Sequence, residues 1–117
     1  MPYMLLMVEP NGQRAERGVE AGHQVYDRML GFTADLQARR LLLASESLSS
    51  QSNAVRVQVR DGRTRMIDGP FAEAKEMVGG FFLLDTESRD EALAIAAQCP
   101  AAEWLTVEVR KVGPCWE

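Results

Sequence analysis

The sequence has few of the residues that bind metals or form disulfides. It contains one histidine and two cysteines among 117 residues. Cys99 and Cys115 lack the CxxC spacing, so a zinc-finger or iron–sulfur site would have almost no ligands. We therefore expect no metal and no cofactor. A basic surface is lacking too, because thirteen Lys and Arg stand against seventeen Asp and Glu, a net charge of −4. This balance argues against direct binding of nucleic acid.

Long hydrophobic runs are also missing. The first apolar segment, residues 3–8, is too short to span a membrane, and it has neither preceding basic residues nor a following cleavage site. It is typical of a buried strand. We expect a cytoplasmic protein that makes no membrane contact and keeps its cysteines as thiols. Its 46% hydrophobic and 26% charged content favours one folded domain, residues 1–117, with a sizeable core.

Hydrophobic periodicity predicts two helices and six strands. The helices cover residues 23–39 and the segment that follows Ser88 and ends at Pro100. The capping box formed by Ser88 and Glu91 marks the start of the second helix. The predicted strands are residues 3–8, 41–44, 55–60, 63–67, 81–84 and 104–112.

Two local patterns refine these elements. Asp61-Gly62 between two alternating segments predicts a hairpin with a type I′ turn. In the first helix, one apolar face is formed by Val25, Met29, Phe32 and Leu36, and a close backbone approach would explain Gly31. Residues 13–22 are polar, and we expect an exposed loop or a poorly packed helical turn there.

The element order is a split β-α-β arrangement with an inserted hairpin, which is an α+β fold with two helices on one face of an antiparallel sheet. The opposite face would then be bare. Because residues 3–8 and 81–84 are apolar on both sides, something must cover that face, and a second copy of the chain is the simplest cover. We therefore expect a homodimer.

Residues 68–76, DGPFAEAKE, followed by Gly79-Gly80-Phe81, resemble the signature of the DGPF-domain proteins within the YCII-related family. Residues 83–85, 90–93, 98–100 and 107–110 are similar to the second half of the same family. This resemblance covers most of residues 3–112. It implies a ferredoxin-like fold that dimerises sheet to sheet into a dimeric α+β barrel, and it implies no defined reaction.

Relatives of the YCII type carry a histidine in the first helix that pairs with an aspartate as an acid–base dyad. In this sequence the corresponding position falls near Arg28. Arginine does not exchange protons near neutral pH, so we do not expect that dyad. His23 lies five residues earlier and would reach a pocket only from the start of the helix. Alternatively, it is a partly exposed polar residue.

The 68–76 segment has two interpretations. In the first, Asp68 caps a rigid turn, Phe71 anchors it in the core, and the remaining charged side chains are solvated. In the second, carboxylates and a lysine converge at a cleft mouth, where neighbouring negative charge raises a carboxyl pKa and makes a general base possible. The side chains concerned are Asp68, Glu73, Lys75 and Glu76.

Charge is unevenly distributed along the chain. Residues 55–67 carry a net charge of +3, whereas residues 68–91 carry −5. Arg56 and Arg60 share one side of their strand, where they would bind an anionic ligand or an acidic protein surface. The alternative is pairing of these arginines with the acidic segment, within one chain or across a dimer.

Two hypotheses for function follow, and the sequence does not decide between them or between an enzyme and a simple binder. The first is a protein that binds or transforms a small molecule in a pocket between the sheet and the first helix. Phe71, Phe81 and Phe82 would line this pocket. Its ligand-binding candidates are Asp68, Phe71, Glu73, Lys75, Glu76 and Arg28, and its catalytic candidates are Asp68, Glu73, Glu76 and His23.

The second hypothesis is a non-catalytic accessory or regulatory protein. Genes of DGPF-type proteins commonly lie beside those of extracytoplasmic-function sigma factors, so the resemblance implies a link to transcription. No helix-turn-helix or basic recognition helix is visible in the sequence. Such a protein would act through a protein partner or a ligand and not through DNA.

Overall fold

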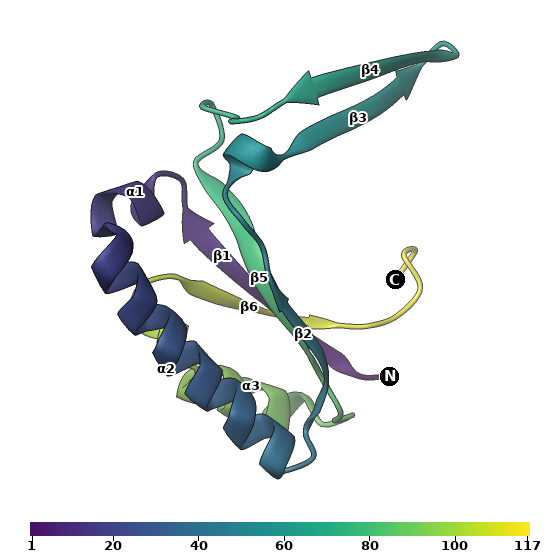
Figure 1. Ribbon diagram of the computed structural model, residues 1–117. Helices are drawn as coiled ribbons and strands as arrows, with labels where there is room; N and C mark the ends of the chain where they lie inside the picture. The colour runs from purple at the N-terminus through teal and green to yellow at the C-terminus, as the bar shows by residue number, and fades with distance from the viewer.

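The computed structural model describes all 117 residues and contains a four-stranded antiparallel sheet (Figure 1). Its strands are β1 (Tyr3–Pro10), β2 (Leu42–Ser47), β5 (Glu76–Leu84) and β6 (Thr106–Lys111). They lie in the order β2-β5-β1-β6. This is the ferredoxin-like α+β arrangement, so the predicted fold class is confirmed, with β1 as a central strand.

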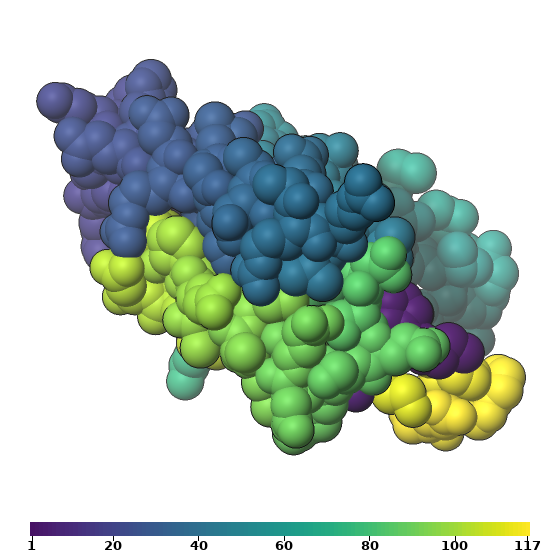
Figure 2. All heavy atoms as spheres, turned by 90° about the horizontal axis from the view of Figure 1, so that it is seen from below, coloured from purple at the N-terminus to yellow at the C-terminus, as the bar shows by residue number.

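Two helices cover one face of this sheet, as predicted. They are α2 (Val19–Ala38) and α3 (Arg89–Gln98), and Figure 2 shows them next to each other over the same side. The Ser88 hydroxyl accepts a hydrogen bond of 3.1 Å from the Glu91 backbone N–H, which confirms Ser88 as the N-cap. The reciprocal bond of the predicted capping box is not formed, because the Ser88 N–H donates to Thr86 Oγ1 at 3.1 Å and not to the Glu91 side chain. The short helix α1 (Gln13–Arg17) and the 3₁₀ segments Gln51–Asn53 and Pro100–Glu103 lie in the connections.

The core lies between the sheet and the helices. Alternate residues of β1 and β5 point toward α2 and α3, and they include the fully buried Leu5 and Leu84. The rings of Phe32 and Phe82 meet edge to face with centroids 5.3 Å apart. The predicted apolar face of the first helix is confirmed, because Phe32 and Leu36 are buried, and Val25 and Met29 are half-buried.

The other sheet face has no covering layer in this chain. Its central side chains come from the intervening positions of β1 and β5, where Leu6 pairs with Phe81 and Met4 with Leu83. All four are half-buried. We call this surface, with Met4, Leu6, Val8, Phe81 and Leu83, the open face. Its apolar character is the one expected from the sequence.

The inserted hairpin forms a separate two-stranded sheet from β3 (Val55–Arg60) and β4 (Arg63–Asp68). It projects from one end of the main sheet (Figure 1). Asp61 and Gly62 both have positive φ, 53° and 74°, which confirms the type I′ turn. One face of the hairpin carries the exposed apolar residues Val55, Val57, Val59 and Met66. The opposite face carries Arg56, Gln58, Arg60, Arg63 and Arg65.

Several boundaries differ from the sequence prediction. Strand β5 begins at Glu76, five residues before the predicted start at Phe81, and β2 continues to Ser47. Helix α2 begins at Val19, inside a segment expected to be a loop or a weak turn. Gly31 is not in a close backbone contact, because a Cβ there would have no atom within 4 Å. That explanation of Gly31 is wrong, since the residue lies on the exposed side of α2.

Candidate functional site

The turn between the hairpin and β5 is held mainly by backbone groups and by an asparagine from β1's end. The Asn11 side-chain amide donates to the carbonyl oxygens of Phe71 and Ala74, at 3.2 and 2.9 Å. The Asn11 backbone N–H donates to the Lys75 carbonyl at 2.8 Å. One polar residue that is distant in sequence therefore fixes three carbonyls of the 71–75 segment.

The start of this turn is packed against the 3₁₀ segment that precedes the hairpin. The Gly69 N–H donates to the Ala54 carbonyl at 2.8 Å, and the Phe71 N–H to Gln51 Oε1 at 3.4 Å. A Cβ on Gly69 would lie 1.9 Å from the Gln51 carbonyl oxygen, so only glycine fits. The Gly69–Pro70 peptide bond is cis.

Asp68 does not cap this turn. Its side chain is exposed and makes no hydrogen bond or ion pair, while Asn11 and Gln51 supply the side-chain contacts of the turn. The predicted capping role is therefore wrong. Phe71 is 5% exposed, which confirms it as the anchor, and Glu73, Lys75 and Glu76 are exposed as the first interpretation expected.

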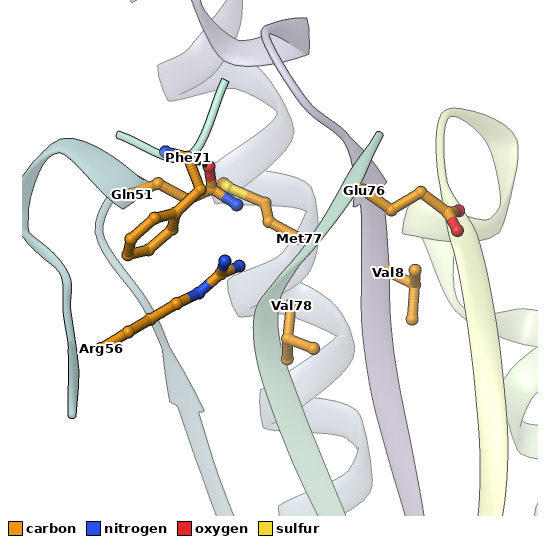
Figure 3. Close-up of a pocket in the computed structure, with 7 residues that line it drawn as sticks. All are labelled: Val8, Gln51, Arg56, Phe71, Glu76, Met77 and Val78. Atoms are coloured by element: carbon orange, nitrogen blue, oxygen red, sulfur yellow. Dashed lines mark hydrogen bonds between the residues drawn. The ribbon is translucent and has the colours of Figure 1, made fainter. Parts of the chain in front are cut away.

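An open groove of about 330 Å³ lies between this turn, the start of β3 and the sheet. Figure 3 shows it on the side of the sheet turned away from α2. We call it the Phe71 groove; it is lined by Val8, Gln51, Arg56, Phe71, Glu76, Met77 and Val78. A second groove of about 260 Å³ adjoins it, because both include Gln51, Met77 and Val78.

Arg56 is the only cationic residue that lines the Phe71 groove. Its guanidinium carbon lies 3.7 Å from the centroid of the Phe71 ring, which is a close cation–π contact. The nearest carboxylate is that of Glu73, whose Oε1 lies 3.8 Å from Arg56 Nη1. This distance is too long for a hydrogen bond, and both side chains are about half exposed or more. Among the arginines of residues 55–67, Arg56 is therefore the only one that pairs with a residue of the acidic segment 68–91 within this chain.

A buried ion pair lies on the other side of the sheet, where sequence reasoning assigned no chemistry. Glu9 is 4% exposed and accepts hydrogen bonds from Arg14 Nη2 at 2.7 Å and Nε at 3.1 Å. Arg14 Nη1 also donates to the Leu48 carbonyl at 2.8 Å, which ties the connection after β2 to the sheet. A Cβ on Gly79 would lie 1.9 Å from Glu9 Oε1, so the glycine makes room for the carboxylate.

A signal for Glu9 was present in the sequence. Glu9 continues the period of two set by Leu5 and Met7, so it occupies an inward position of β1. A charged residue at such a position needs a partner. The identity of that partner, Arg14, depends on the turn into α1, which the sequence did not specify.

The structure brings together only part of the predicted ligand-binding set. Phe71 and Glu76 line the Phe71 groove, and Glu73 lies at its edge beside Arg56. Asp68 and Lys75 belong to the same turn but do not line the groove. The proposed convergence of Asp68, Glu73 and Glu76 with Lys75 at one cleft mouth is therefore not found.

Arg28 and His23 lie on α2, across the sheet from the Phe71 groove. Arg28 pairs with Glu103 and lies over the Trp104 ring, 5.4 Å from its centroid. The hydrogen bond that the Arg28 guanidinium donates to the Glu103 carboxylate lowers the pKa of Glu103. His23 is exposed. Neither residue lines the groove, so the structure does not bring these two candidates to it. The exposure of His23 agrees with the alternative that it is a polar surface residue.

The space between the sheet and α2 is occupied by core side chains. Phe82 packs there against Phe32, whereas Phe81 points to the open face. These two neighbours in β5 lie on opposite faces because side chains alternate along a strand. Phe71, Phe81 and Phe82 therefore do not line one pocket, and the predicted location of the pocket beside the first helix is wrong.

The cysteines and the remaining charged residues are the other candidate nucleophiles or metal ligands. Cys99 is buried, and burial raises the pKa of its thiol, while Cys115 is exposed; both are free. No group of three or more His, Cys, Asp or Glu side chains is placed to hold a metal ion. None of the helices has the length and apolar character needed to cross a membrane.

Two comparisons with known proteins found similarity to this chain. The family model of the YCII-related domain matches residues 1–115. The chain is also similar to an uncharacterised protein of Rhizobium meliloti (strain 1021), with 57% identity over 35 residues. That match covers 30% of this chain and 28% of the relative, so the chain spans well under two thirds of the relative's length.

Proposed function

The chain belongs to the YCII-related family, and we propose that it binds a small organic molecule in the Phe71 groove. The observation that carries this proposal is that two segments distant in sequence are fixed together to form the walls. Gln51 and Phe71 are joined by a hydrogen bond, and Asn11 fixes the turn that carries Phe71. Walls that are already in place reduce the entropy lost when a ligand binds.

The lining supports binding better than catalysis. Val8, Met77 and Val78 provide apolar contact, while Arg56 and Gln51 provide polar groups at one side. Glu76 is the one acidic residue of the lining, and no histidine, cysteine or serine lines the groove with it. The Glu73 carboxylate lies at the edge beside Arg56, and no hydrogen bond joins it to Glu76. Acid–base or nucleophilic catalysis usually needs a pair of such groups within hydrogen-bond reach.

The proposal is tested by screening small organic molecules against ¹⁵N-labelled protein with two-dimensional NMR. A ligand of the groove should shift the backbone signals of Gln51, Phe71, Met77 and Val78. Val78→Trp should abolish these shifts, because Val78 is 47% exposed within the groove and a larger side chain would fill it.

Val19→Trp is the matched control. Val19 is 78% exposed at the start of α2 and lies outside the groove, so the same substitution there should leave ligand binding unchanged. Shifts confined to other regions, or shifts that persist in Val78→Trp, would show that the site lies elsewhere.

We also propose that the protein acts as a homodimer whose second copy covers the open face. Leu6, Phe81 and Leu83 form an apolar surface there with no layer above it, and Val57 and Val59 of the hairpin are 59% and 58% exposed. Exposed apolar surfaces of this kind usually mark an interface. Val8 and Val78 are paired on the same side of the sheet, so a partner chain would also border the Phe71 groove.

Light scattering tests the oligomeric state. We expect a mass of twice 13.0 kDa at micromolar concentration. Leu6→Asp should produce a monomer because it places a charge in the centre of the open face, whereas Asp90→Asn on α3 should leave the dimer unchanged. A wild-type mass of 13.0 kDa at this concentration would refute the dimer.

A further inference from the structure

We infer that the ligand of the Phe71 groove is an amphipathic monoanion: an organic carboxylate whose charged end is bound by Arg56 and whose apolar body lies on Val78 and Val8. This inference rests on the proposed function, because it assigns a chemical class to the molecule in the same groove. It is carried by the position of Arg56, by its free hydrogen-bond donors and by the charges around it.

The guanidinium of Arg56 is held in place without using its donors. Phe71 is 5% exposed, so its ring is fixed, and the guanidinium lies 3.7 Å from the ring centroid. Contact with a ring face restricts a guanidinium while leaving its N–H groups, which lie in the guanidinium plane, directed outward. In Figure 3 the end of the Arg56 side chain points from β3 toward Met77 and Val78.

None of the Arg56 N–H groups donates a hydrogen bond within the chain, and the contact with Glu73 is 3.8 Å long. The other arginines that contact the body are different. Arg14 donates to Glu9 and Leu48, and Arg28 donates to both oxygens of Glu103. Arg56 thus combines a defined position with unused donors, which is the arrangement that binds an oxyanion.

Gln51 adds a donor on the same side. Its Oε1 accepts from the Phe71 N–H at 3.4 Å, and this contact fixes the orientation of the amide. The Gln51 Nε2 group has no hydrogen-bond partner in the chain, and it lies in the lining together with Arg56. Two donor groups therefore stand at one end of a floor formed by the apolar side chains of Met77, Val78 and Val8.

The charges around the groove favour a carboxylate ligand over a phosphate. Glu73 lies at the edge of the groove and Glu76 lines it, so two negative charges accompany one arginine. A dianionic phosphate would be repelled more strongly than a carboxylate by these groups. The groove volume of about 330 Å³ is at the small end of ligand sites, which fits a carboxylate with a short chain or a single ring.

The test uses three probes that share one 3-phenylpropyl body and differ in the head group: 4-phenylbutanoate, 4-phenylbutanamide and 3-phenylpropyl phosphate. Each is titrated into ¹⁵N-labelled full-length protein at constant ionic strength, and affinity is read from the signals of Gln51, Phe71 and Val78. We expect the carboxylate to bind about tenfold more tightly than the amide, the difference that one charge-assisted hydrogen-bonded contact supplies. The phosphate should bind more weakly than the carboxylate.

Variants connect this preference to Arg56. Arg56→Gln should make the carboxylate and the amide bind equally, with little loss of amide affinity. Arg65→Gln is the matched control, because Arg65 lies on the same face of the hairpin, outside the groove. It should leave the preference unchanged. Glu73→Gln should tighten carboxylate binding by about twofold to threefold, because it removes the charge that competes for Arg56.

The outcomes separate the two proposals. Equal shifts of groove signals by the carboxylate and the amide in wild-type protein would overturn the anionic class and leave the small-molecule site intact. Tighter binding of the phosphate would replace the monoanion by a phosphoryl compound. An equal loss of preference in Arg56→Gln and Arg65→Gln would show attraction to the whole basic hairpin and refute a site at Arg56. If no probe shifts the groove signals, the inference fails, and the library screen decides the proposed function.

Discussion

The two-layer body and the hairpin both contain strands with an apolar face, but these faces are stabilised differently. Side-chain directions alternate along β1 and β3, so that Leu5 and Met7, or Val55 and Val57, share one face. In the body α2 and α3 cover that face, and Leu5 is fully buried. On the hairpin nothing in the chain covers it, and Val57 remains 59% exposed. An apolar face thus specifies a strand, while its burial depends on whether another layer reaches it.

The two regions also treat arginine differently. In the body Arg14 is bound to a buried carboxylate and to a main-chain carbonyl, where it stabilises the connection after β2. On the hairpin Arg56 rests on Phe71 and keeps its donors free. Arg14, whose donors are used in hydrogen bonds, has a structural role. Arg56, whose donors are free and which lies at the junction between the two regions, is the better candidate for ligand binding.

The largest predicted effect compares a buried apolar residue of the body with an exposed apolar residue of the hairpin. Leu5→Ala should lower the free energy of unfolding by about 2–5 kcal/mol, because it leaves a cavity in the core. Val57→Ala should change it by less than about 0.5 kcal/mol in dilute protein, since Val57 is exposed in one chain. Urea denaturation followed by circular dichroism measures both.

Protein concentration sharpens the same prediction. If a second chain buries the hairpin, the effect of Val57→Ala should grow as the concentration rises, whereas that of Leu5→Ala should be present throughout. A large effect of Val57→Ala that does not depend on concentration would mean that the hairpin packs on its own body.

Gly79→Ala should be nearly as destabilising, by about 2–4 kcal/mol. The new methyl group would occupy the position of the Glu9 carboxylate, and separating Glu9 from Arg14 would leave a buried charge without its partner. Thermal unfolding monitors the loss. An unchanged melting temperature would show that the ion pair rearranges freely, which would contradict its structural role.

Asn11→Ala tests the junction between the regions. It should cost about 1–3 kcal/mol, because the Phe71 and Ala74 carbonyls lose their side-chain donor. Asp68→Ala in the same turn is the control, and it should change the free energy of unfolding by less than about 0.5 kcal/mol. The reverse order of the two effects, measured by urea denaturation, would restore the capping role of Asp68.

The smallest effect is a stabilisation on the outer surface of the body. Gly31→Ala should raise the free energy of unfolding by about 0.5–1 kcal/mol, because the position is helical and a Cβ there meets no other atom. Differential scanning calorimetry measures the corresponding rise in melting temperature. A decrease would indicate that this side of α2 is in close contact with another surface.

Local patterns predicted the two helices that cover the sheet and the six strands, with boundaries that differ in part. The hairpin turn at Asp61-Gly62, the cap at Ser88 and the apolar face of α2 were all identified from residues at most eleven positions apart. These features depend on the backbone conformation that a short segment prefers. The split β-α-β arrangement followed from the element order, because few topologies satisfy short connections and one covered sheet face.

The candidate site could not be predicted in the same way. Its groove exists because Gln51 bonds to the backbone of Phe71, twenty residues away, and because Asn11 bonds to the same turn across sixty residues. The motif at 68–76 correctly indicated a segment that borders the groove. Its first acid, Asp68, nevertheless makes no hydrogen bond or ion pair. Arg56 and Gln51 were not part of the predicted site, although one of the two interpretations of Arg56 was that it binds an anion.

The amino-acid sequence alone determined the class of the fold, the hairpin, the helix cap and the apolar character of both faces of the central strands. These properties come from periodicity and turn chemistry, which act within a few residues. Only the tertiary structure decided that Glu9 is paired with Arg14, that Gly79 must lack a side chain, and that Arg56 keeps its donors free beside Phe71. Each of these depends on the distance between atoms of separate elements, and side-chain packing sets that distance when the chain folds.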